Sequence, residues 1–405
     1  MTALIIFLVS YLGIAMGRIP GLTVDRVGIA ILGAIAMVAF GAVSPQEAVR
    51  CIDFPTLCLL YGLMIISAQL RLGGFYTATA EKVLKFSDRP RLFLLVSMLL
   101  SAVLSALLAN DIICFAMAPI LAYSLKRAGL NPVPFLLGLA MSSNIGSAST
   151  LIGNPQNMLI GQVGRLSFQA FFLWAFIPSF ISLVAAFGII IIFYRQNLIV
   201  ERIEIMDQNG LGWPQFDGWQ TGKGIVAVAV LVGLYLTDIP RDLSTLTVAG
   251  SLLLSRKIKS REIMALVDWH LITLFCALFI IIHGITLAHL PEQVLKFLSQ
   301  KGFELTQPVF LTGVSVIVSN LFSNVPAVML VIPCLSKTIP EPWYILALSS
   351  TFAGNLFLLG SIANLIVVEK ALGHGVLISF KEHARIGIPV TILSLLVLVG
   401  WTFLI

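Results

Sequence analysis

Long apolar runs separated by short polar segments make up most of the chain. A helix needs about 20 mostly apolar residues to cross the roughly 30 Å hydrocarbon core of a bilayer. On this criterion the pattern predicts about ten transmembrane helices, near residues 2–17, 27–42, 54–70, 135–160, 168–194, 222–237, 243–255, 269–288, 343–368 and 384–404. We therefore expect an all-α, polytopic membrane protein.

Two further apolar stretches, 92–125 and 308–336, carry polar residues at their centres. The centres are Ala109-Asn110-Asp111 and Ser323-Asn324-Val325-Pro326. After the first centre, the 14 residues from 112 to 125 would form a helix of about 21 Å, which is too short to cross the bilayer. We predict that each stretch is a re-entrant helical hairpin with its tip at the polar centre. Two full crossings per stretch are the alternative, because both arrangements return the chain to the same side.

Composition excludes several classes of protein. Charged residues make up 11% of the 405 residues and hydrophobic residues 58%, whereas soluble proteins carry about 25% charged residues. A soluble enzyme, a nucleic-acid-binding protein and a disordered scaffold are therefore excluded. All 25 Lys and Arg lie between the apolar runs or at the second residue of one, as Lys223 and Arg385 do, with 19 on one side in the alternation of loops and 6 on the other. The positive-inside rule makes the first set cytoplasmic, so both termini are expected outside.

The two halves of the chain repeat each other. Matching residues recur at a constant offset of 214 around the two hairpins: Ser105, Asn110 and Pro119 in the first, Ser319, Asn324 and Pro333 in the second. A Leu-Ile-Gly or Leu-Leu-Gly motif followed by Asn also recurs in the spans 135–160 and 343–368. Because each half has five spans, the second half must be inverted, as in many secondary transporters. We predict a first repeat over 1–195, a cytoplasmic linker over 196–221 and a second repeat over 222–405.

Polar residues interrupt two of the predicted spans. The run 142–157 has nine Ser, Thr, Asn or Gln residues together with Gly and Pro, and the run 354–364 is its shorter partner. Irregular backbone at membrane depth is tolerated only where it lines a cavity or is buried in protein. Both spans are therefore expected to be discontinuous helices. Small-residue helix packing is an alternative that fits Gly354 and Ala363 better than the longer run.

Two titratable residues lie at membrane depth. Asp111 is the one acidic residue there, and such a carboxylate is by default a functional candidate. It could also cap the second hairpin arm, and the two roles are compatible. His283 lies within the span 269–288, where it is either a proton relay or an ordinary hydrogen-bond donor. The other histidines, His270, His289, His374 and His383, lie at span ends or in loops and are expected to be solvated.

These motifs resemble the signatures of the ion transporter superfamily. It includes citrate–metal permeases, arsenite permeases, divalent-anion/sodium symporters and sodium/proton antiporters. The first signature is Asn144-Ile145-Gly146 with 150–155 and Asn157, and the second is 353–356 with 359–361 and Asn364. The first tip is most similar to the arsenite-permease version. The symporters carry Ser-Asn-Thr at both tips, and its absence here disfavours a dicarboxylate substrate.

The resemblance implies elevator-type alternating access, in which a transport domain of hairpins and broken helices moves against a scaffold. It implies that the segments 75–86 and 287–298 are interfacial helices, and that the protein could be a homodimer. Substrate-binding candidates are Asn110, Asp111, Asn154, Ser323, Asn324 and Ser361. Candidates for binding Na⁺ are Asn110, Asn144, Gly153, Asn157, Asn324, Asn355, Gly360 and Asn364.

We expect a secondary active transporter in the plasma or bacterial inner membrane that moves a small anion or oxyanion of the citrate, sulfate or arsenite type. Either Asp111 carries the coupling proton, or the substrate is a neutral acid such as arsenite, silicic or boric acid. A sodium/proton antiporter is the alternative. A membrane enzyme is remote, since no paired aspartates, His/Cys cluster or G-x-S-x-G motif occurs. No cofactor, metal centre or nucleic-acid partner is expected beyond the coupling ion, Na⁺ or H⁺, and the five cysteines do not suggest a disulfide framework.

Overall fold

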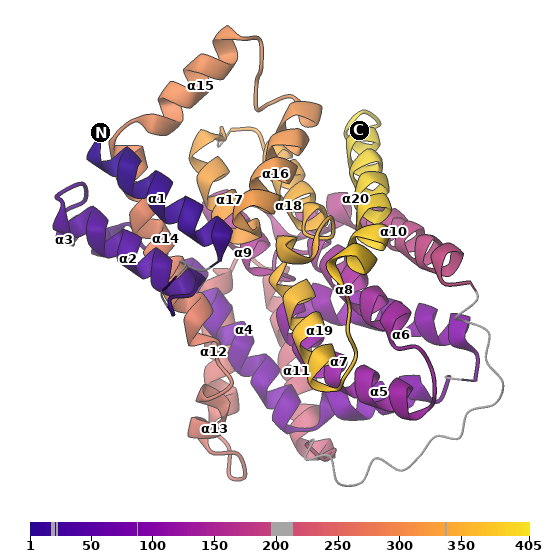
Figure 1. Ribbon diagram of the computed structural model, residues 1–405. Coiled ribbons are helices and arrows are strands. Elements are labelled where there is room, and N and C mark those ends of the chain that lie inside the picture. The colour runs from indigo at the N-terminus through magenta and orange to yellow at the C-terminus, as the bar shows by residue number, and fades with distance from the viewer. Residues whose placement is uncertain (18–20, 22, 87, 196–213, 337) are drawn as a thin grey trace.

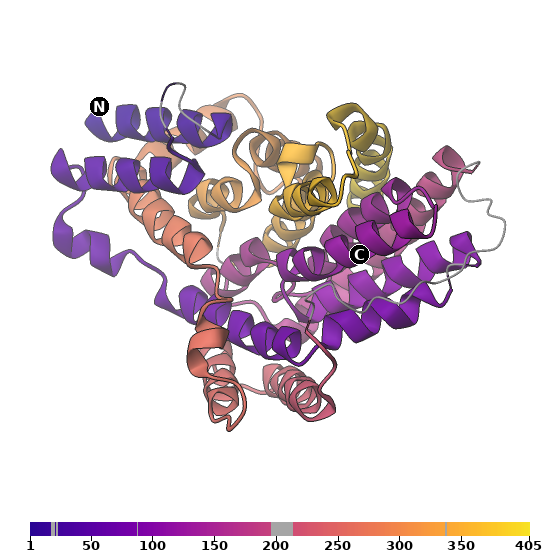
Figure 2. The same cartoon turned by 60° about the horizontal axis from the view of Figure 1, so that its bottom comes forward.

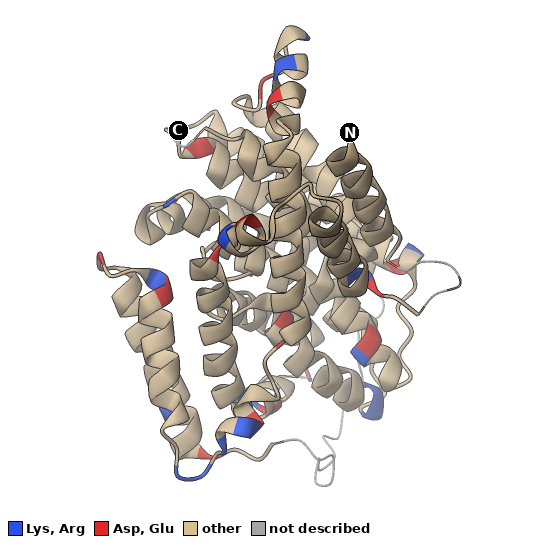
Figure 3. Ribbon diagram, turned by 90° about the vertical axis from the view of Figure 1, so that its left-hand side faces the viewer, with Lys and Arg blue, Asp and Glu red and all other residues tan. Residues whose placement is uncertain are grey.

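The computed structural model describes residues 1–17, 21, 23–86, 88–195, 214–336 and 338–405. Their regular structure is helical throughout, as the sequence predicts. Five helices are long and apolar enough to cross a membrane: Phe54–Leu72, Pro90–Leu107, Phe168–Phe193, Trp269–Leu287 and Phe380–Thr402. Other apolar helices are shorter, so the count of ten crossings stays a prediction. Charged residues lie mainly at helix ends and in loops, leaving long stretches of helix uncharged (Figure 3).

The helices follow the same order in the two halves. The first half contains α1 (Thr2–Met16), α2 (Arg26–Ala39), α3 (Pro45–Arg50), α4 (Phe54–Leu72), α5 (Phe75–Leu84), α6 (Pro90–Leu107), α7 (Asn110–Arg127), α8 (Val133–Ala148), α9 (Pro155–Val163) and α10 (Phe168–Phe193). The second contains α11 (Gly218–Tyr235), α12 (Arg241–Leu253), α13 (Ser260–Met264), α14 (Trp269–Leu287), α15 (Leu290–Gln300), α16 (Pro308–Phe322), α17 (Asn324–Val331), α18 (Glu341–Ala353), α19 (Ile362–Gly373) and α20 (Phe380–Thr402), with short 3₁₀ turns at Ile332–Cys334 and Leu358–Gly360. The inverted orientation of the second half stays a prediction.

The long helices pack into two groups that lie side by side (Figure 1). The scaffold group consists of α1, α2, α4, α11, α12 and α14, in which α12 packs on α4 and α2 packs on α14. The hairpin group consists of α6 to α10 and α16 to α20, in which α6 packs on α8, α16 on α18 and α10 on α20. Figure 2 shows the same separation from another side, with the indigo N-terminal helices away from the magenta helices of the hairpin group.

Both predicted discontinuous helices are interrupted at the predicted motifs. Helix α8 ends at Ala148 and α9 begins at Pro155. The Asn154 side chain accepts a hydrogen bond from the Asn157 amide at 2.9 Å, so it caps α9, and Pro155 occupies the first helical position. These are standard signals for a helix start. In the second half, α18 ends at Ala353 and α19 begins at Ile362.

The turns at 108–109 and at Ser323 coincide with the predicted hairpin tips. Helix α7 runs from Asn110 to Arg127, however, so the second arm of the first stretch has 18 residues rather than 14. It is longer because Asn110 and Asp111 begin the helix and Lys126 and Arg127 continue it beyond its apolar part. The length of this arm therefore no longer supports a re-entrant hairpin in the first half. The alternative in which Asp111 caps this arm is wrong, because Ala109 is the N-cap residue and no side chain caps the helix.

Three connecting segments were predicted. Helix α5 lies within the predicted interfacial segment 75–86, and α15 begins within the predicted segment 287–298 and ends two residues beyond it, at Gln300. Helix α15 projects away from the body (Figure 1). Residues 196–213 of the predicted linker 196–221 lie outside the described residues. The linker prediction extends too far, because α11 already begins at Gly218, where the Asp217 side chain accepts hydrogen bonds from the amides of Trp219 and Gln220.

Gly146 allows the closest approach of α8 to α6. A Cβ atom at this position would lie 2.3 Å from the backbone of Ala102. We expect Gly146→Ala to destabilise the protein by about 1–3 kcal/mol, because backbone atoms cannot move aside as a flexible side chain can. Thermal unfolding in detergent measures this change. The matched control is Gly188→Ala in α10, where no atom lies within 4 Å; equal unfolding temperatures for the two variants would contradict the close packing.

Candidate functional site

The two tips and the two helix breaks meet around a small cavity with a free volume of about 20 Å³. Its lining residues are Asn110, Asp111, Pro155, Gln156, Ser323, Asn324, Val325, Ser361 and Ile362. All predicted substrate residues except Asn154 are in this set, and Asn154 is fully buried next to it. The lining contains a carboxylate, amides and hydroxyls but neither Lys nor Arg. Such a site offers no cationic side chain to an anion.

Asn144 of α8 joins the two halves beneath this cavity. Its side-chain oxygen accepts hydrogen bonds from Asn110 Nδ2 at 2.9 Å and from Ser361 Oγ at 3.0 Å. Its side-chain nitrogen donates to Asn355 Oδ1 at 2.8 Å and to Asn364 Oδ1 at 3.2 Å. Asn144 is buried, with 1% of its surface exposed. One amide therefore fixes the first tip and the second break relative to each other.

Residues related by the repeat make related hydrogen bonds. Asn144 and Thr351 are 207 residues apart, and so are Asn154 and Ser361. Ser361 donates to Asn144, and Asn154 Nδ2 correspondingly donates to Thr351 Oγ1 at 3.3 Å. The residue at the start of the second helix segment in each half therefore hydrogen-bonds to the equivalent residue of the other half.

Two asparagines hold the broken ends of the helices. Asn157 and Asn364, again 207 residues apart, donate through Nδ2 to backbone carbonyls that the breaks leave without helical partners: Thr150 at 2.9 Å and Ser147 at 3.4 Å for Asn157, Gly354 at 2.8 Å and Phe357 at 3.4 Å for Asn364. Unpaired carbonyls at such depth cost several kcal/mol each in lipid. These two side chains therefore stabilise the breaks.

Each tip contacts a helix break that carries other Na⁺ candidates. The backbone N–H of Asn110 donates to the backbone carbonyl of Gly153 at 2.9 Å. With its side-chain amide oriented to satisfy its neighbours, Asn324 donates to the carbonyls of Gly360 at 3.1 Å and Ser350 at 3.0 Å. Asn110 Oδ1 is buried without a hydrogen-bond donor among the described residues. This oxygen is available to a cation or to a donor on a ligand.

The other predicted Na⁺ ligands are less free. Asn144, Asn157 and Asn364 use their side chains in the hydrogen bonds above, and Asn355 Oδ1 accepts from Asn144 while its Nδ2 has no partner among the described residues. Binding of Na⁺ by these side chains would require exchange of a hydrogen bond. Their role as ligands stays a prediction.

The two proton-coupling candidates differ in position. Asp111 is half-buried at the cavity and makes neither a hydrogen bond nor an ion pair with the described residues. His283 belongs to α14 of the scaffold group and does not line the cavity. The expectation that His383 is solvated is wrong: only 1% of its surface is exposed, and neither ring nitrogen has a partner among the described residues. His383 lies on α20, which buries it against other helices of the hairpin group. The sequence placed His383 near the end of a span and did not reveal this packing.

Sequence reasoning missed Gln156 as a cavity residue. Its side-chain nitrogen donates to Thr351 Oγ1 at 3.2 Å, and the residue lines the cavity beside Asp111. The sequence did contain a signal for Gln156: Asn154 is a typical N-cap residue and Pro155 a typical first helical residue, which places Gln156 in the first turn of α9. That this turn faces the tips depends on contacts between distant segments.

Comparison with known proteins gives a consistent picture. A family model described as "Citrate transporter" matches residues 11–353. A relative from Mycobacterium leprae named "46 kDa membrane protein" is 29% identical, over 97% of this chain and 96% of the relative. The "Putative transporter arsB" of Dictyostelium discoideum is 24% identical over 97% and 89%, and the "Silicon efflux transporter LSI3" of Oryza sativa subsp. japonica is 26% identical over 92% and 91%.

We expect Asn144→Ala to lower the free energy of unfolding by about 2–4 kcal/mol, because it leaves several buried partners unpaired. Asn110→Ala should cost less, since only one of its side-chain atoms has a partner. Thermal unfolding in detergent ranks the variants. Ser179→Ala is the matched control, because the Ser179 hydroxyl is buried without a partner among the described residues. Equal unfolding temperatures for Asn144→Ala and the control would refute the central role of this amide.

Proposed function

We propose that this chain, which belongs to the citrate transporter family, is a secondary active transporter of a small oxyanion or of its neutral acid, coupled to H⁺ or Na⁺. It is a multi-pass integral membrane protein, and its relatives carry transporter names. The observation that carries the proposal is the cavity between the tips, where Asp111 has neither a cationic partner nor a hydrogen bond among the described residues. An ionised carboxylate in such a site repels a bound anion.

Two ways of relieving this repulsion are open. Either Asp111 binds a proton together with the anion, or the substrate enters as an uncharged acid. The volume of about 20 Å³ has room for about one water molecule, so binding requires the cavity to widen, and a compact ligand needs less widening than citrate does. The names of the relatives from Dictyostelium discoideum and Oryza sativa support arsenite-type or silicic-acid-type substrates. Among the described residues of the lining, the Ser323 hydroxyl and the second side-chain N–H of Gln156 are the donors that suit oxygen atoms of such ligands, because Ser361 and Asn324 already donate to Asn144 and to backbone carbonyls.

For the transport cycle we propose elevator-type alternating access with inverted repeats. The related pairs Ser361–Asn144 and Asn154–Thr351 support this, because a two-fold relation between halves makes each contact occur twice with the roles exchanged. The hairpin group would be the moving domain and the scaffold group the stationary one.

A sodium/proton antiporter is the second candidate. The free oxygen of Asn110 beside the Asp111 carboxylate favours it, because oxygen ligands of this kind suit a small hard cation. In that case Na⁺ and H⁺ would compete for one site and no oxyacid would be moved.

A thermal-shift screen of the purified protein separates the candidates. We expect arsenite or silicic acid to stabilise the protein, because selective binding raises stability by about 2.7 kcal/mol at 100 times Kd. The stabilisation should depend on pH, because the charge of Asp111 affects binding. The panel crosses Na⁺ and K⁺ with citrate, succinate, sulfate, phosphate, arsenite and silicate at two pH values. Stabilisation by Na⁺ alone would favour the antiporter, and stabilisation by citrate alone would contradict a compact substrate.

Asp111→Asn tests the coupling role. In proteoliposomes we expect this variant to lose proton-coupled transport, because the amide keeps the shape of the carboxylate but cannot carry the proton. Uptake of the ligand found in the screen is measured with and without a pH gradient. The control is Glu369→Gln on α19, whose side chain is 76% exposed. Full coupled transport with an unchanged pH profile in Asp111→Asn would overturn the proton-carrying role.

A further inference from the structure

Two side chains of the scaffold group hydrogen-bond to backbone carbonyls of the hairpin group. Arg241, the first residue of α12, donates through Nη2 to the Gly161 carbonyl at 2.7 Å. Tyr11 of α1 donates through its hydroxyl to the Pro326 carbonyl of α17 at 3.1 Å. Among the described residues these are the side-chain hydrogen bonds that join the two groups directly. Neither residue lines the cavity between the tips.

The Arg241 bond is chemically strong. Gly161 lies in the last turn of α9, where carbonyls lack helical partners and carry the negative end of the helix dipole. Its oxygen also accepts from the Leu166 amide at 3.1 Å, so both lone pairs are used. A guanidinium donor at 2.7 Å is a charge-assisted hydrogen bond, which is about twice as strong as a neutral one. The bond anchors the end of α9 to α12.

The Tyr11 bond lies close to the second tip. Tyr11 is 1% exposed, and its ring contacts Phe322 edge-on with a centroid distance of 5.1 Å. Its acceptor, Pro326, is two residues after Asn324. The bond therefore holds the segment that carries a cavity residue. A tyrosine hydroxyl this deeply buried normally needs a partner, so breaking the bond requires a new one or exposure to water.

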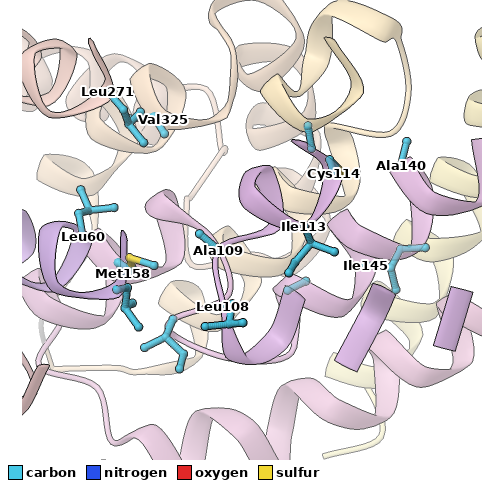
Figure 4. Packing of buried hydrophobic residues seen from close by; sticks show 14 of the residues in the cluster. Leu60, Leu108, Ala109, Ile113, Cys114, Ala140, Ile145, Met158, Leu271 and Val325 are labelled. Carbon is cyan, nitrogen blue, oxygen red and sulfur yellow. The ribbon is translucent and has the colours of Figure 1, made fainter. Parts of the chain in front are cut away.

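Apolar contacts reinforce both bonds. Helix α9 packs on α4, where Leu60 lies beside Met158, and α17 packs on α14, where Leu271 lies beside Val325 (Figure 4). The two hydrogen bonds and these two contacts hold the same two segments, α9 and α17. Any displacement of the hairpin group along the scaffold group must break them together.

The equivalent position in the other half makes no such bond. Arg26 is the first residue of α2, as Arg241 is of α12, and the two are 215 residues apart, the separation that also relates Asp53 to Asp268. The Arg26 guanidinium lies against Gly17, with Nε 3.4 Å from the position of a Cβ on that residue, and forms no hydrogen bond or ion pair with the described residues. A bond present in one repeat and absent from the other indicates a conformation closed at one face only.

We propose that Tyr11 and Arg241 are positioning residues that hold the hairpin group in the conformation of this structure, and that both bonds break when the cavity is exposed at the opposite face. The inference rests on the proposed alternating-access transport. Arg241 lies between the predicted spans 222–237 and 243–255, in a loop of the set with 6 Lys and Arg that is predicted to lie outside, so the closed face is the outer one. The bonds set the equilibrium between the two states, since weakening them favours the state in which they are absent.

Labelling of a cavity cysteine from each side of the membrane tests this. Ile362→Cys, a half-buried cavity position outside the contacts named above, supplies the probe in a background with the native cysteines at 51, 58, 114, 276 and 334 replaced. Tyr11→Phe and Arg241→Met remove the donors and keep most of each side chain's bulk. In oriented vesicles, a membrane-impermeant maleimide should label the background from the cytoplasmic side. We expect Arg241→Met to shift the outside-to-cytoplasmic labelling ratio about tenfold toward the outside, which is about 1.4 kcal/mol, and Tyr11→Phe to shift it in the same direction.

Matched controls separate this effect from loss of structure. Tyr61→Phe removes a hydroxyl of α4 that donates to Met264 of α13 and makes no contact with the hairpin group through that bond, and Arg26→Met removes the counterpart arginine. Tyr61→Phe should leave the ratio unchanged, and Arg26→Met should leave it unchanged or shift it the opposite way. Transport by Tyr11→Phe and Arg241→Met should show altered kcat with KM changed far less, because neither side chain touches the cavity.

The outcomes distinguish the two proposals. If substrate and ion gradients switch the labelled face but Tyr11→Phe and Arg241→Met leave the ratio unaltered, the positioning role is refuted and alternating access stands. If no gradient, ligand or variant ever changes the labelled face, the proposed transport cycle itself fails. Unfolding temperatures of all variants are measured alongside, and a shifted ratio in a variant of unchanged stability supports the positioning role.

Discussion

Backbone hydrogen bonding at the two helix breaks is the constraint on which the rest of the structure depends. Water is not available at membrane depth to satisfy free carbonyls, so a broken helix there must find partners within the protein. Asn157 and Asn364 supply them through their side-chain amides. With the ends fixed in this way, the first turn of α9 and Ser361 before α19 can face the hairpin tips, and a cavity lined by polar groups forms between them.

The chemistry of the cavity follows from what surrounds it. Several buried amides and hydroxyls hydrogen-bond to one another through Asn144, whereas Asn110 Oδ1 and the Asp111 carboxylate accept no hydrogen bond from the described residues. A site with spare acceptors and no cationic side chain suits protons, small cations and uncharged oxyacids better than a multiply charged anion. The way the helix breaks pack therefore decides which polar groups are left free in the cavity, and these groups support the proposed substrate class.

Rigidity inside the hairpin group contrasts with the few bonds that cross to the scaffold group. The two tips and two breaks are joined by hydrogen bonds among side chains and from side chains to backbone carbonyls, so they would move as one body. Across the boundary, the bonds of Tyr11 and Arg241 end on backbone carbonyls. A small number of discrete bonds suits a boundary along which one body slides, because each can form and break as a unit.

The sequence by itself determined where helices break and turn, because those signals are local: Asn154-Pro155 starts α9, and the polar tips end α6 and α16. It also placed most of the cavity residues, since the repeated motifs carry them. Only the tertiary structure decided that Asn144 pairs with Asn355 and Ser361, more than 200 residues away, that Gln156 joins the cavity and that His383 is buried. The reason is physical: hydrogen-bond partners and burial depend on which segments meet in space, and no local pattern of residues specifies that meeting.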